Sequence, residues 1–301
     1  MTGAGGQVGA EAVRLGGAGV VGVGRGGLDV TDRDAVLRAV EQAEPDVVVH
    51  AAAYTAVDRA EAEADRAYAV NRDGAAHVAE ACARAGVPLV HLSTDYVFDG
   101  TKGTPYVPDD PPAPLGVYGA SKAAGETAVR ERLDQHLILR TAWVFSGRPG
   151  SFVSTMLRLA SERPRLGVVA DQWGHPTWAT ALARACLHAA ALAAEGRAPW
   201  GTWHVAGAPL TTWHGLAEAA VAAGAERGVT PAVPVDPIAT AGYPTAARRP
   251  ARVELEIAPS LAALGLAPLD WRDGVGPSVD EWAAEGGRRK AEGGRGAGAG
   301  R

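Results

Sequence analysis

Short apolar runs alternate with longer amphipathic stretches along the first half of the chain. The apolar runs at residues 20–23, 46–50 and 88–92 are rich in Val and Leu, while residues 34–43 and 61–85 place apolar side chains at helical spacing. Strands that are apolar throughout are typical of a parallel sheet with helices on both faces. The pattern predicts an α/β fold with a Rossmann-like, doubly wound parallel sheet.

The second half continues with further elements. Strands are expected at residues 137–140 and 166–169, and a Pro-rich surface loop at 105–114. Helices are expected at residues 121–132, 153–161, 180–195 and, after an N-cap at Thr212, 213–223. Residues 285–301 are of low complexity, rich in Gly and Arg, and predict a disordered tail.

Composition and charge narrow the classes of partner. The 301 residues carry a formal net charge of -5, and the basic residues are dispersed until the tail, which indicates neither nucleic acid nor a membrane surface as partner. Cys82 and Cys186 have no cysteine or histidine at ligand spacing, so we expect buried thiols rather than a zinc site or a disulfide. Without a membrane-length apolar stretch or a signal-type leader, the sequence predicts a cytoplasmic protein.

Glycines recur at positions 3, 6 and 9 in the segment Thr2-Gly3-Ala4-Gly5-Gly6-Gln7-Val8-Gly9. This spacing serves a tight turn, close backbone approach to a pyrophosphate, and helix packing, although Val8 stands where the GxGxxG pattern has glycine. A flexible glycine-rich N-terminus is the alternative. The helix-like run and the β units that follow favour dinucleotide binding.

A strand normally precedes such a glycine loop, but only Met1 stands before Thr2. The first strand, which is the central one of the sheet, is therefore truncated in this sequence. We hypothesise that the natural start lies upstream and that Met1 is a miscalled start codon at the last strand position. Intact-mass analysis of the native protein tests this hypothesis, and a native N-terminus at Met1 or Thr2 would contradict it.

The end of the strand at residues 20–23 bears on cofactor choice. Arg25 follows it without an immediate acidic residue, and an arginine there accommodates a 2′-phosphate, which favours NADP(H) and leaves NADH as the alternative. Asp29 has the sequence distance of a ribose-binding carboxylate, but it lies in a loop with Val30. We expect a contact to the adenine edge there, with helix capping by Thr31 or Asp32 as the alternative role of this loop.

Tyr118 and Lys122 form a Tyr-x-x-x-Lys pair in a chain that has only three lysines and six tyrosines. On a helix the two side chains share one face. A phenol with a pKa of about 10 ionises poorly near neutrality, and a neighbouring ammonium stabilises its ionised form. The pair therefore suits acid/base chemistry, with a surface contact between helix neighbours as the alternative.

Four motifs occur together and in order. They are Thr2-Gly3-x-x-Gly6-x-x-Gly9, Ala51-Ala52-Ala53-Tyr54-Thr55-Ala56-Val57-Asp58, Ser93-Thr94-Asp95-Tyr96-Val97-Phe98-Asp99-Gly100 and Tyr118-Gly119-x-Ser121-Lys122. Through them the chain resembles the extended short-chain dehydrogenase/reductases over about residues 1–283. Residues 139–145, 171–177 and 211–214 make it most similar to the branch that reduces dTDP-4-dehydro-L-rhamnose to dTDP-L-rhamnose. The resemblance implies an NADPH-dependent oxidoreductase acting on a dTDP-sugar.

The resemblance also implies roles for single residues. Tyr118 would donate a proton to the C4 oxygen of the sugar, Lys122 would hold the cofactor ribose and lower the tyrosine pKa, and Thr94 would hydrogen-bond the same oxygen. Asp95 and Trp143 would face the substrate together with Thr94. Besides Tyr118 and Lys122, the residues expected to border the cofactor are Gly3, Gly5, Gly6, Gln7, Val8, Arg25, Asp29, Val30, Ala51, Ala52, Ala53, Tyr54 and Thr55.

Domains and assembly follow from the same resemblance. Residues 1–145, rejoined by 178–205, would form the NADP(H)-binding domain, and residues 146–177 with 206–283 the smaller C-terminal substrate-binding part. Family members form homodimers and can bind Mg²⁺ at the dimer interface, so both are expectations here. The sequence has no carboxylate cluster with ligand spacing, and we predict no catalytic metal.

Two other functions stay open from the sequence. The first keeps the reaction but changes the nucleotide-4-keto-6-deoxysugar, because Gly116 and the Ala251-Arg252 pair depart from residues that the family often has at these positions. The second is a non-catalytic binding subunit like the regulatory β subunit of methionine adenosyltransferase. Retention of Thr94, Tyr118 and Lys122 argues against that subunit.

Overall fold

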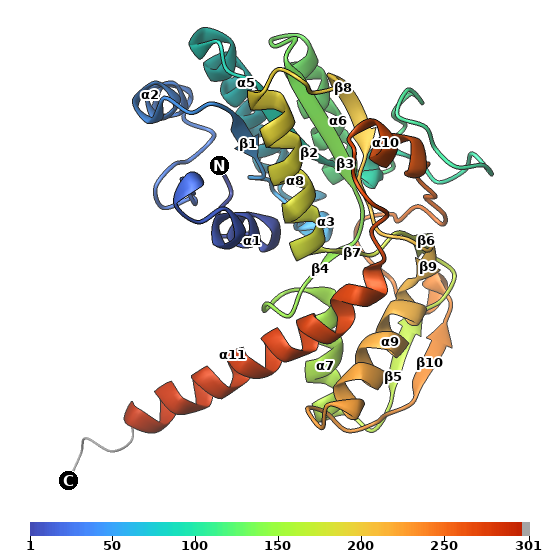
Figure 1. Ribbon diagram of the computed structural model, residues 1–301. Helices are drawn as coiled ribbons and strands as arrows, with labels where there is room; N and C mark the ends of the chain where they lie inside the picture. The colour runs from blue at the N-terminus through green and yellow to red at the C-terminus, as the bar shows by residue number, and fades with distance from the viewer. Residues whose placement is uncertain (297–301) are drawn as a thin grey trace.

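Four parallel strands form the main sheet of the computed structural model, which describes the backbone of residues 1–296 and the side chains of residues 1–286. In sheet order they are β1 (Val48–His50), β2 (Leu89–Thr94), β3 (His136–Thr141) and β8 (Gly201–His204). Because every neighbouring pair is parallel, the carboxyl ends of the strands lie at one edge (Figure 1). The strands predicted at 46–50, 88–92 and 137–140 are confirmed.

The two strands expected before β1 are reduced to single paired residues. Thr2 bridges both Val23 and His50, and the Thr2 N–H donates to the Val49 carbonyl oxygen at 3.0 Å. The first of these strands is thus represented by Thr2 alone. The prediction of a strand over residues 20–23 is wrong for most of its length, because Thr2 offers only one position for pairing and Val21 is 70% exposed.

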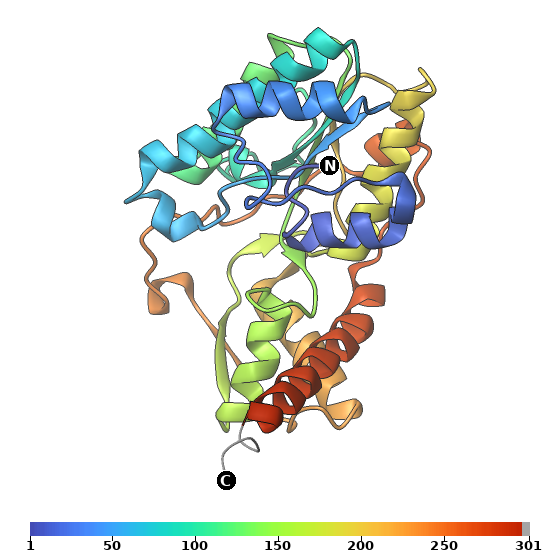
Figure 2. The same ribbon diagram turned by 90° about the vertical axis from the view of Figure 1, so that its left-hand side faces the viewer.

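Helices cover both faces of the sheet, as Figure 2 shows. One face carries α1 (Gln7–Gly16), α8 (Ala179–Ala194) and α10 (Ala258–Ala263), and the other carries α2 (Arg33–Ala43), α5 (Gly74–Ala85) and α6 (Val117–Arg130). Val8 and Leu182 are buried in the first core and Val36 and Val129 in the second. The doubly wound parallel sheet is confirmed.

The helix expected over residues 61–85 is divided. After the short α3 (Val57–Ala60), the chain forms α4 (Ala64–Tyr68), a π-helical turn over Ala69–Asp73, and then α5. Such π-helical turns are frequent at functional sites. This one carries Asn71, which is buried.

A second lobe lies beneath the sheet in Figure 1. Its elements are α7 (Phe152–Glu162), β5 (Leu166–Val169), α9 (Trp213–Glu226), β10 (Val235–Ile238) and α11 (Val275–Gly296). β5 pairs in parallel with β10 rather than with the main sheet. The N-cap at Thr212 is confirmed, because its hydroxyl accepts from the Gly215 N–H at 3.1 Å.

Two chain segments differ from the expected domains. Leu261 and Leu264, within the range expected for the substrate part, pack in the same core as α8 and the main sheet. The expected disordered tail, residues 285–301, begins inside α11, and residues 297–301 lie outside those that the structure describes.

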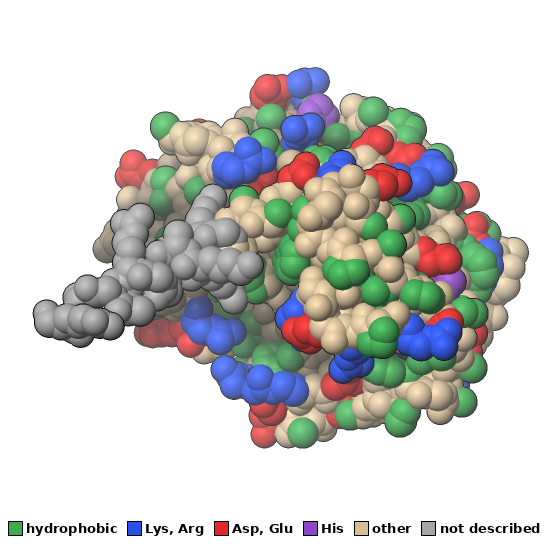
Figure 3. Space-filling model, turned by 90° about the horizontal axis from the view of Figure 1, so that it is seen from below, with side chains coloured by type: hydrophobic (Ala, Val, Ile, Leu, Met, Phe, Trp, Pro, Cys, Tyr) green, Lys and Arg blue, Asp and Glu red, His purple; other side chains and the backbone are tan. Residues whose placement is uncertain are grey.

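Two very short sheets connect the lobes. β4 (Val144–Phe145) pairs with β7 (Thr177–Trp178), and β6 (Trp173–Gly174) pairs with β9 (Thr211–Thr212). On the face in Figure 3, basic and acidic side chains are interspersed, without a broad field of one sign. None of the helices described is long and apolar enough to cross a membrane.

Candidate active site

The glycine loop between Thr2 and α1 is held tightly against its neighbours. Gly3 has φ +73°, and a Cβ there would lie 2.5 Å from the Ala52 nitrogen. A Cβ at Gly9 would lie 2.1 Å from the Gly3 carbonyl oxygen. Gly5 is different, because a Cβ there would meet nothing within 4 Å. Packing within the protein therefore requires glycine at positions 3 and 9, whereas position 5 leaves open space in front of the loop.

The N-terminus of α1 faces this open space without a protein partner for its charge. Its N-cap is Gly6, which supplies no side-chain cap, and its first turn contains no acidic residue. Unpaired N–H groups at a helix N-terminus favour an anion such as a pyrophosphate. The Gln7 side chain instead turns toward the second lobe, where its Nε2 donates to the Val144 carbonyl and its Oε1 accepts from Ser146.

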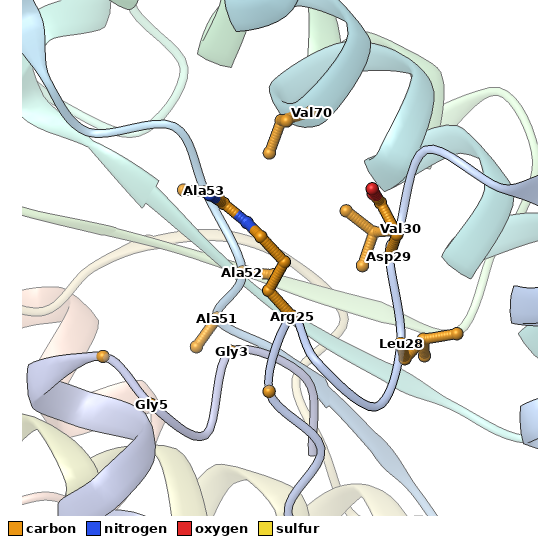
Figure 4. A pocket seen from close by; sticks show the side chains of 12 residues that line it. Gly3, Gly5, Arg25, Leu28, Asp29, Val30, Ala51, Ala52, Ala53 and Val70 are labelled. Carbon is orange, nitrogen blue, oxygen red and sulfur yellow. The ribbon is translucent and has the colours of Figure 1, made fainter.

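A cavity of about 230 Å³ lies in front of the glycine loop (Figure 4). It is lined by Gly3, Gly5, Gly6, Gly24, Arg25, Leu28, Asp29, Val30, Ala51, Ala52, Ala53 and Val70. Nine of the residues expected to border the cofactor therefore surround one pocket. The open Gly5 position, the uncapped helix and the Arg25 cation together fit a dinucleotide that carries phosphate groups.

Six of the expected cofactor residues do not line this pocket: Gln7, Val8, Tyr54, Thr55, Tyr118 and Lys122. Val8 is buried in the core beneath α1. The buried Tyr54 donates its hydroxyl to Glu63 at 3.0 Å, and Thr55 is exposed. Asp29 does line the pocket, but its carboxylate accepts from the Thr31 N–H at 3.0 Å, while Asp32 caps α2. Capping by Asp32, the alternative for this loop, is confirmed.

Thr94 and Tyr118 meet at the carboxyl edge of the sheet. Thr94 is the last residue of β2, and Tyr118 lies in the first turn of α6. The Thr94 hydroxyl donates to Asp95 Oδ1 at 3.0 Å and accepts from the Tyr96 N–H at 3.2 Å, and it lies close enough to the phenol to lower the Tyr118 pKa. Burial raises the pKa of Tyr118 to about 12, partly offset by Thr94, so the phenol is protonated at neutral pH.

Lys122 follows one turn later and is 2% exposed. Its ammonium donates to the Leu92 carbonyl at 2.6 Å and lies 3.4 Å from His91 Nε2. Burial lowers the pKa of Lys122 to about 8. The groups that shift the Tyr118 pKa are its burial, Thr94 and Asp95, and Lys122 is not among them. The lowering of the tyrosine pKa by Lys122, implied by the resemblance, is therefore not seen in this arrangement.

Asp95 and Trp143 have surroundings that the sequence did not indicate. Asp95 is 1% exposed, and burial raises the pKa of its carboxyl to about 7. Trp143 has φ +44°, an uncommon conformation for a bulky residue, and its ring packs against Gly174 and stacks on Trp213. Trp143 follows β3 at the junction with the second lobe, whereas Asp95 lies in the turn after β2, and neither lines the dinucleotide pocket.

Sequence reasoning missed two buried polar groups that support this edge. Asn71 accepts from the Tyr54 N–H at 2.8 Å and donates to Ser121 at 2.9 Å, which joins the loop after β1 to α6. Glu126 accepts two hydrogen bonds from Arg140 and one from Ser93. Arg140 is a charged residue next to the apolar residues Leu137–Leu139 of β3, and this was the sequence signal that could have indicated a buried ion pair.

A small second pocket adjoins Tyr118. It is lined by Val57, Glu61, Tyr96, Phe98, Leu115, Gly116, Tyr118, Gly119, Ala247, Arg248 and Pro250. Arg248 is exposed there, whereas Arg249 is ion-paired to Asp58 at 2.7 Å. Arg248 is a cation that sequence reasoning did not select. Among the described residues, no group of three or more His, Cys, Asp or Glu side chains could hold a metal ion.

This fold and this edge define a class. A parallel sheet with a glycine loop, a phosphate-fitting pocket and a Thr–Tyr–Lys set on β2 and α6 characterises an extended short-chain dehydrogenase/reductase. The family model for the RmlD substrate binding domain matches residues 1–284. The chain belongs to the dTDP-4-dehydrorhamnose reductase family.

Named relatives agree with this assignment. The chain is 46% identical over 292 residues to the dTDP-4-dehydrorhamnose reductase of Burkholderia thailandensis, covering 93% of this chain and 97% of the relative. Identity to the Streptomyces griseus dTDP-4-dehydrorhamnose reductase is 48% over 223 residues, or 72% and 73% of the two chains. The Bacillus anthracis dTDP-4-dehydrorhamnose reductase, solved in complex with NADP, matches with a TM-score of 0.84 at 33% identity, covering 93% of this chain and 97% of that one.

Proposed function

We propose that this chain catalyses the NADPH-dependent reduction of the C4 keto group of dTDP-4-dehydro-L-rhamnose, giving dTDP-L-rhamnose. The observation that carries the proposal is the position of the Tyr118 phenol beside Thr94 at the carboxyl edge of the sheet, where burial keeps it protonated. β1 and β2 are parallel neighbours, with His50 opposite His91, so the Ala51–Ala53 wall of the pocket and Thr94 leave the sheet at the same edge. The proton donor and the cofactor pocket therefore share that edge.

NADPH bound in the glycine-lined pocket supplies a hydride to the sugar C4. Tyr118 donates its proton to the C4 oxygen as negative charge develops there, so the ketone gains one hydride and one proton and becomes an alcohol. The Thr94 hydroxyl, which donates to Asp95 Oδ1 at 3.0 Å, lies beside the phenol and would turn to the C4 oxygen as a second donor. Lys122 offers its ammonium to the cofactor ribose from the same face of α6.

Arg248 supports a nucleotide-sugar as substrate. It lines the pocket next to Tyr118 and is exposed, unlike the ion-paired Arg249. A guanidinium at this place suits the diphosphate that links a nucleoside to its sugar. The Trp143 ring, at the end of β3, offers an apolar wall for the sugar.

The test is NADPH oxidation by the purified chain with dTDP-4-dehydro-L-rhamnose, followed by chromatography of the product. Oxidation with formation of dTDP-L-rhamnose supports the proposal. Oxidation only with 4-keto-6-deoxysugars on another nucleotide would move the assignment to that substrate. A chain that binds NADPH and oxidises it with none of them would be a binding subunit.

Cofactor choice and assembly are further parts of the proposal. Arg25 lines the pocket, so we expect a higher kcat/KM for NADPH than for NADH. Arg25→Ala should lower the ratio of the two kcat/KM values. Cytoplasmic location and a homodimer stay predictions, to be checked by cell fractionation and by light scattering. Nothing in the described residues or the relatives supports a Mg²⁺ site.

A further inference from the structure

The ammonium of Lys122 is held by β2 rather than by a carboxylate. Leu92 accepts one of its N–H groups at 2.6 Å, and His91 Nε2 lies 3.4 Å away. An ammonium has three donors, so this arrangement leaves one N–H for a further acceptor. Lys122 is 2% exposed and His91 is fully buried, so water does not substitute for these acceptors.

The charges around Lys122 require His91 to be a neutral acceptor. On α6 the nearest carboxylate, Glu126, is already engaged by Arg140 and Arg130. The other titratable or charged groups that act on His91 are His50 on β1, His136 on β3 and Arg130 on α6. Burial, Lys122 and His50 hold the pKa of His91 well below its usual range. A neutral imidazole that accepts through Nε2 carries its proton on Nδ1.

That proton has no partner. His91 Nδ1 and His50 Nε2 are both buried without a hydrogen-bond partner among the described residues. His50 stacks on His91 with ring centroids 5.1 Å apart and is itself fixed by the Thr2 hydroxyl at 2.7 Å. A buried donor without an acceptor lowers stability, so folding alone would favour an apolar side chain at position 91.

We propose that His91 is a positioning residue for Lys122. Its Nε2, with the Leu92 carbonyl, fixes the ammonium so that the remaining N–H is directed to the cofactor ribose. This role rests on the proposed function, because it matters only if Lys122 holds a bound dinucleotide. The orphaned Nδ1 and the reduced stability are the consequence of placing an acceptor inside an apolar core.

The small number of lysines makes a direct test practical. The chain has Lys102, Lys122 and Lys290, so ¹³Cε-lysine NMR of the cofactor-free protein gives three signals, and Lys122→Met assigns one of them. His91→Leu removes the acceptor and should lower the pKa of Lys122 by about one unit, a tenfold change in the ratio of deprotonated to protonated amine. His91→Gln places an amide oxygen near the Nε2 position and should restore most of the value. His50→Asn, which leaves the Lys122 contact in place, is the matched control.

Activity and stability complete the test. His91→Leu should raise KM for NADPH and move the alkaline limb of kcat/KM to lower pH, while its Tm stays equal to or above that of wild type. An unshifted Lys122 titration in a folded His91→Leu, or a shift of the same size in His50→Asn, would overturn the role of His91. If His91→Leu does not fold, His91→Gln and His91→Phe decide: equal Lys122 titrations in these two would overturn it. A wild-type protein that binds NADPH without turnover would overturn the proposed function instead.

Discussion

The Trp143 indole stacks on Trp213 with ring centroids 3.7 Å apart and planes 9° from parallel. Trp143 follows β3 of the main sheet, whereas Trp213 begins α9 of the second lobe. The stack therefore joins the lobe that carries the dinucleotide pocket to the lobe expected to bind the sugar. It also fixes Trp143 in its strained backbone conformation, φ +44°.

Removing this stack should weaken binding of the nucleotide-sugar and leave binding of NADPH unchanged. Trp213→Leu is expected to raise KM for the nucleotide-sugar about tenfold, since loss of one aromatic pair costs about 0.5–1.5 kcal/mol beyond area burial. The Kd for NADPH, measured by fluorescence quenching, should stay within about twofold of wild type, because Trp213 does not line that pocket. Trp203→Leu on strand β8 is the control and should leave KM unchanged.

Substitutions at two glycines of the loop should have separate effects, one on stability and the other on cofactor binding. Gly9→Ala brings a Cβ within 2.1 Å of the Gly3 oxygen and should destabilise the protein by about 1–3 kcal/mol, seen as a lower Tm. Gly5→Ala meets no protein atom within 4 Å, so its Tm should match wild type while its NADPH affinity falls. Equal NADPH affinity in Gly5→Ala and wild type would show that the cofactor does not approach this loop.

Tyr118→Phe should abolish most turnover without loss of cofactor binding. Proton transfer from a positioned group typically contributes about 10²- to 10⁴-fold, so kcat should fall by that factor. NADPH titration should give a Kd close to that of wild type. Tyr106→Phe, a buried tyrosine hydrogen-bonded to Asp99, is the matched control and should keep its kcat.

Asp95 should make stability fall with rising pH. Burial raises its pKa from 3.8 to about 7, so the folded state binds more protons than the unfolded state between these values. The free energy of unfolding should therefore decrease from pH 4 to pH 7, by at most about 4 kcal/mol from this group. Urea unfolding of Asp95→Asn at both pH values measures the difference, and an unchanged pH dependence in this variant would contradict the assignment.

Deprotonation of Lys122 should cause the fall of kcat/KM for NADPH at alkaline pH. Burial lowers its pKa to about 8, so the free enzyme loses the ammonium as pH rises through that value. Since kcat/KM reports groups of the free enzyme, kcat/KM for NADPH should decline above about pH 8. Lys122→Arg, whose guanidinium stays charged, should lack this limb even if its absolute rate is low.

The sequence predicted most of the fold because its signals are local. Apolar runs and helical spacing depend on neighbouring residues, as does the cap at Thr212, and the glycine spacing selected Gly3 and Gly6 of the pocket. The strand at residues 20–23 failed because its formation depends on a partner strand, and the segment from Met1 to Ala4 pairs with it only at Val21 and Val23.

The remainder of the site depends on contacts between distant segments. The Glu126–Arg140 pair, the Trp143–Trp213 stack and the approach of Arg248 to Tyr118 each join different elements of the fold. No spacing rule links such residues. Likewise, the pairing of Lys122 with Leu92 and His91 depends on how α6 packs on β2.

Hydride transfer to C4 is the central claim, and isotope transfer tests it most directly. NADPH carrying deuterium on the transferring face of nicotinamide C4 is incubated with the protein and dTDP-4-dehydro-L-rhamnose, and the product is analysed by mass spectrometry and NMR. We predict dTDP-L-rhamnose with a single deuterium at C4 of the sugar. A product with deuterium at another carbon, or NADPH that is bound but never oxidised, would contradict the account.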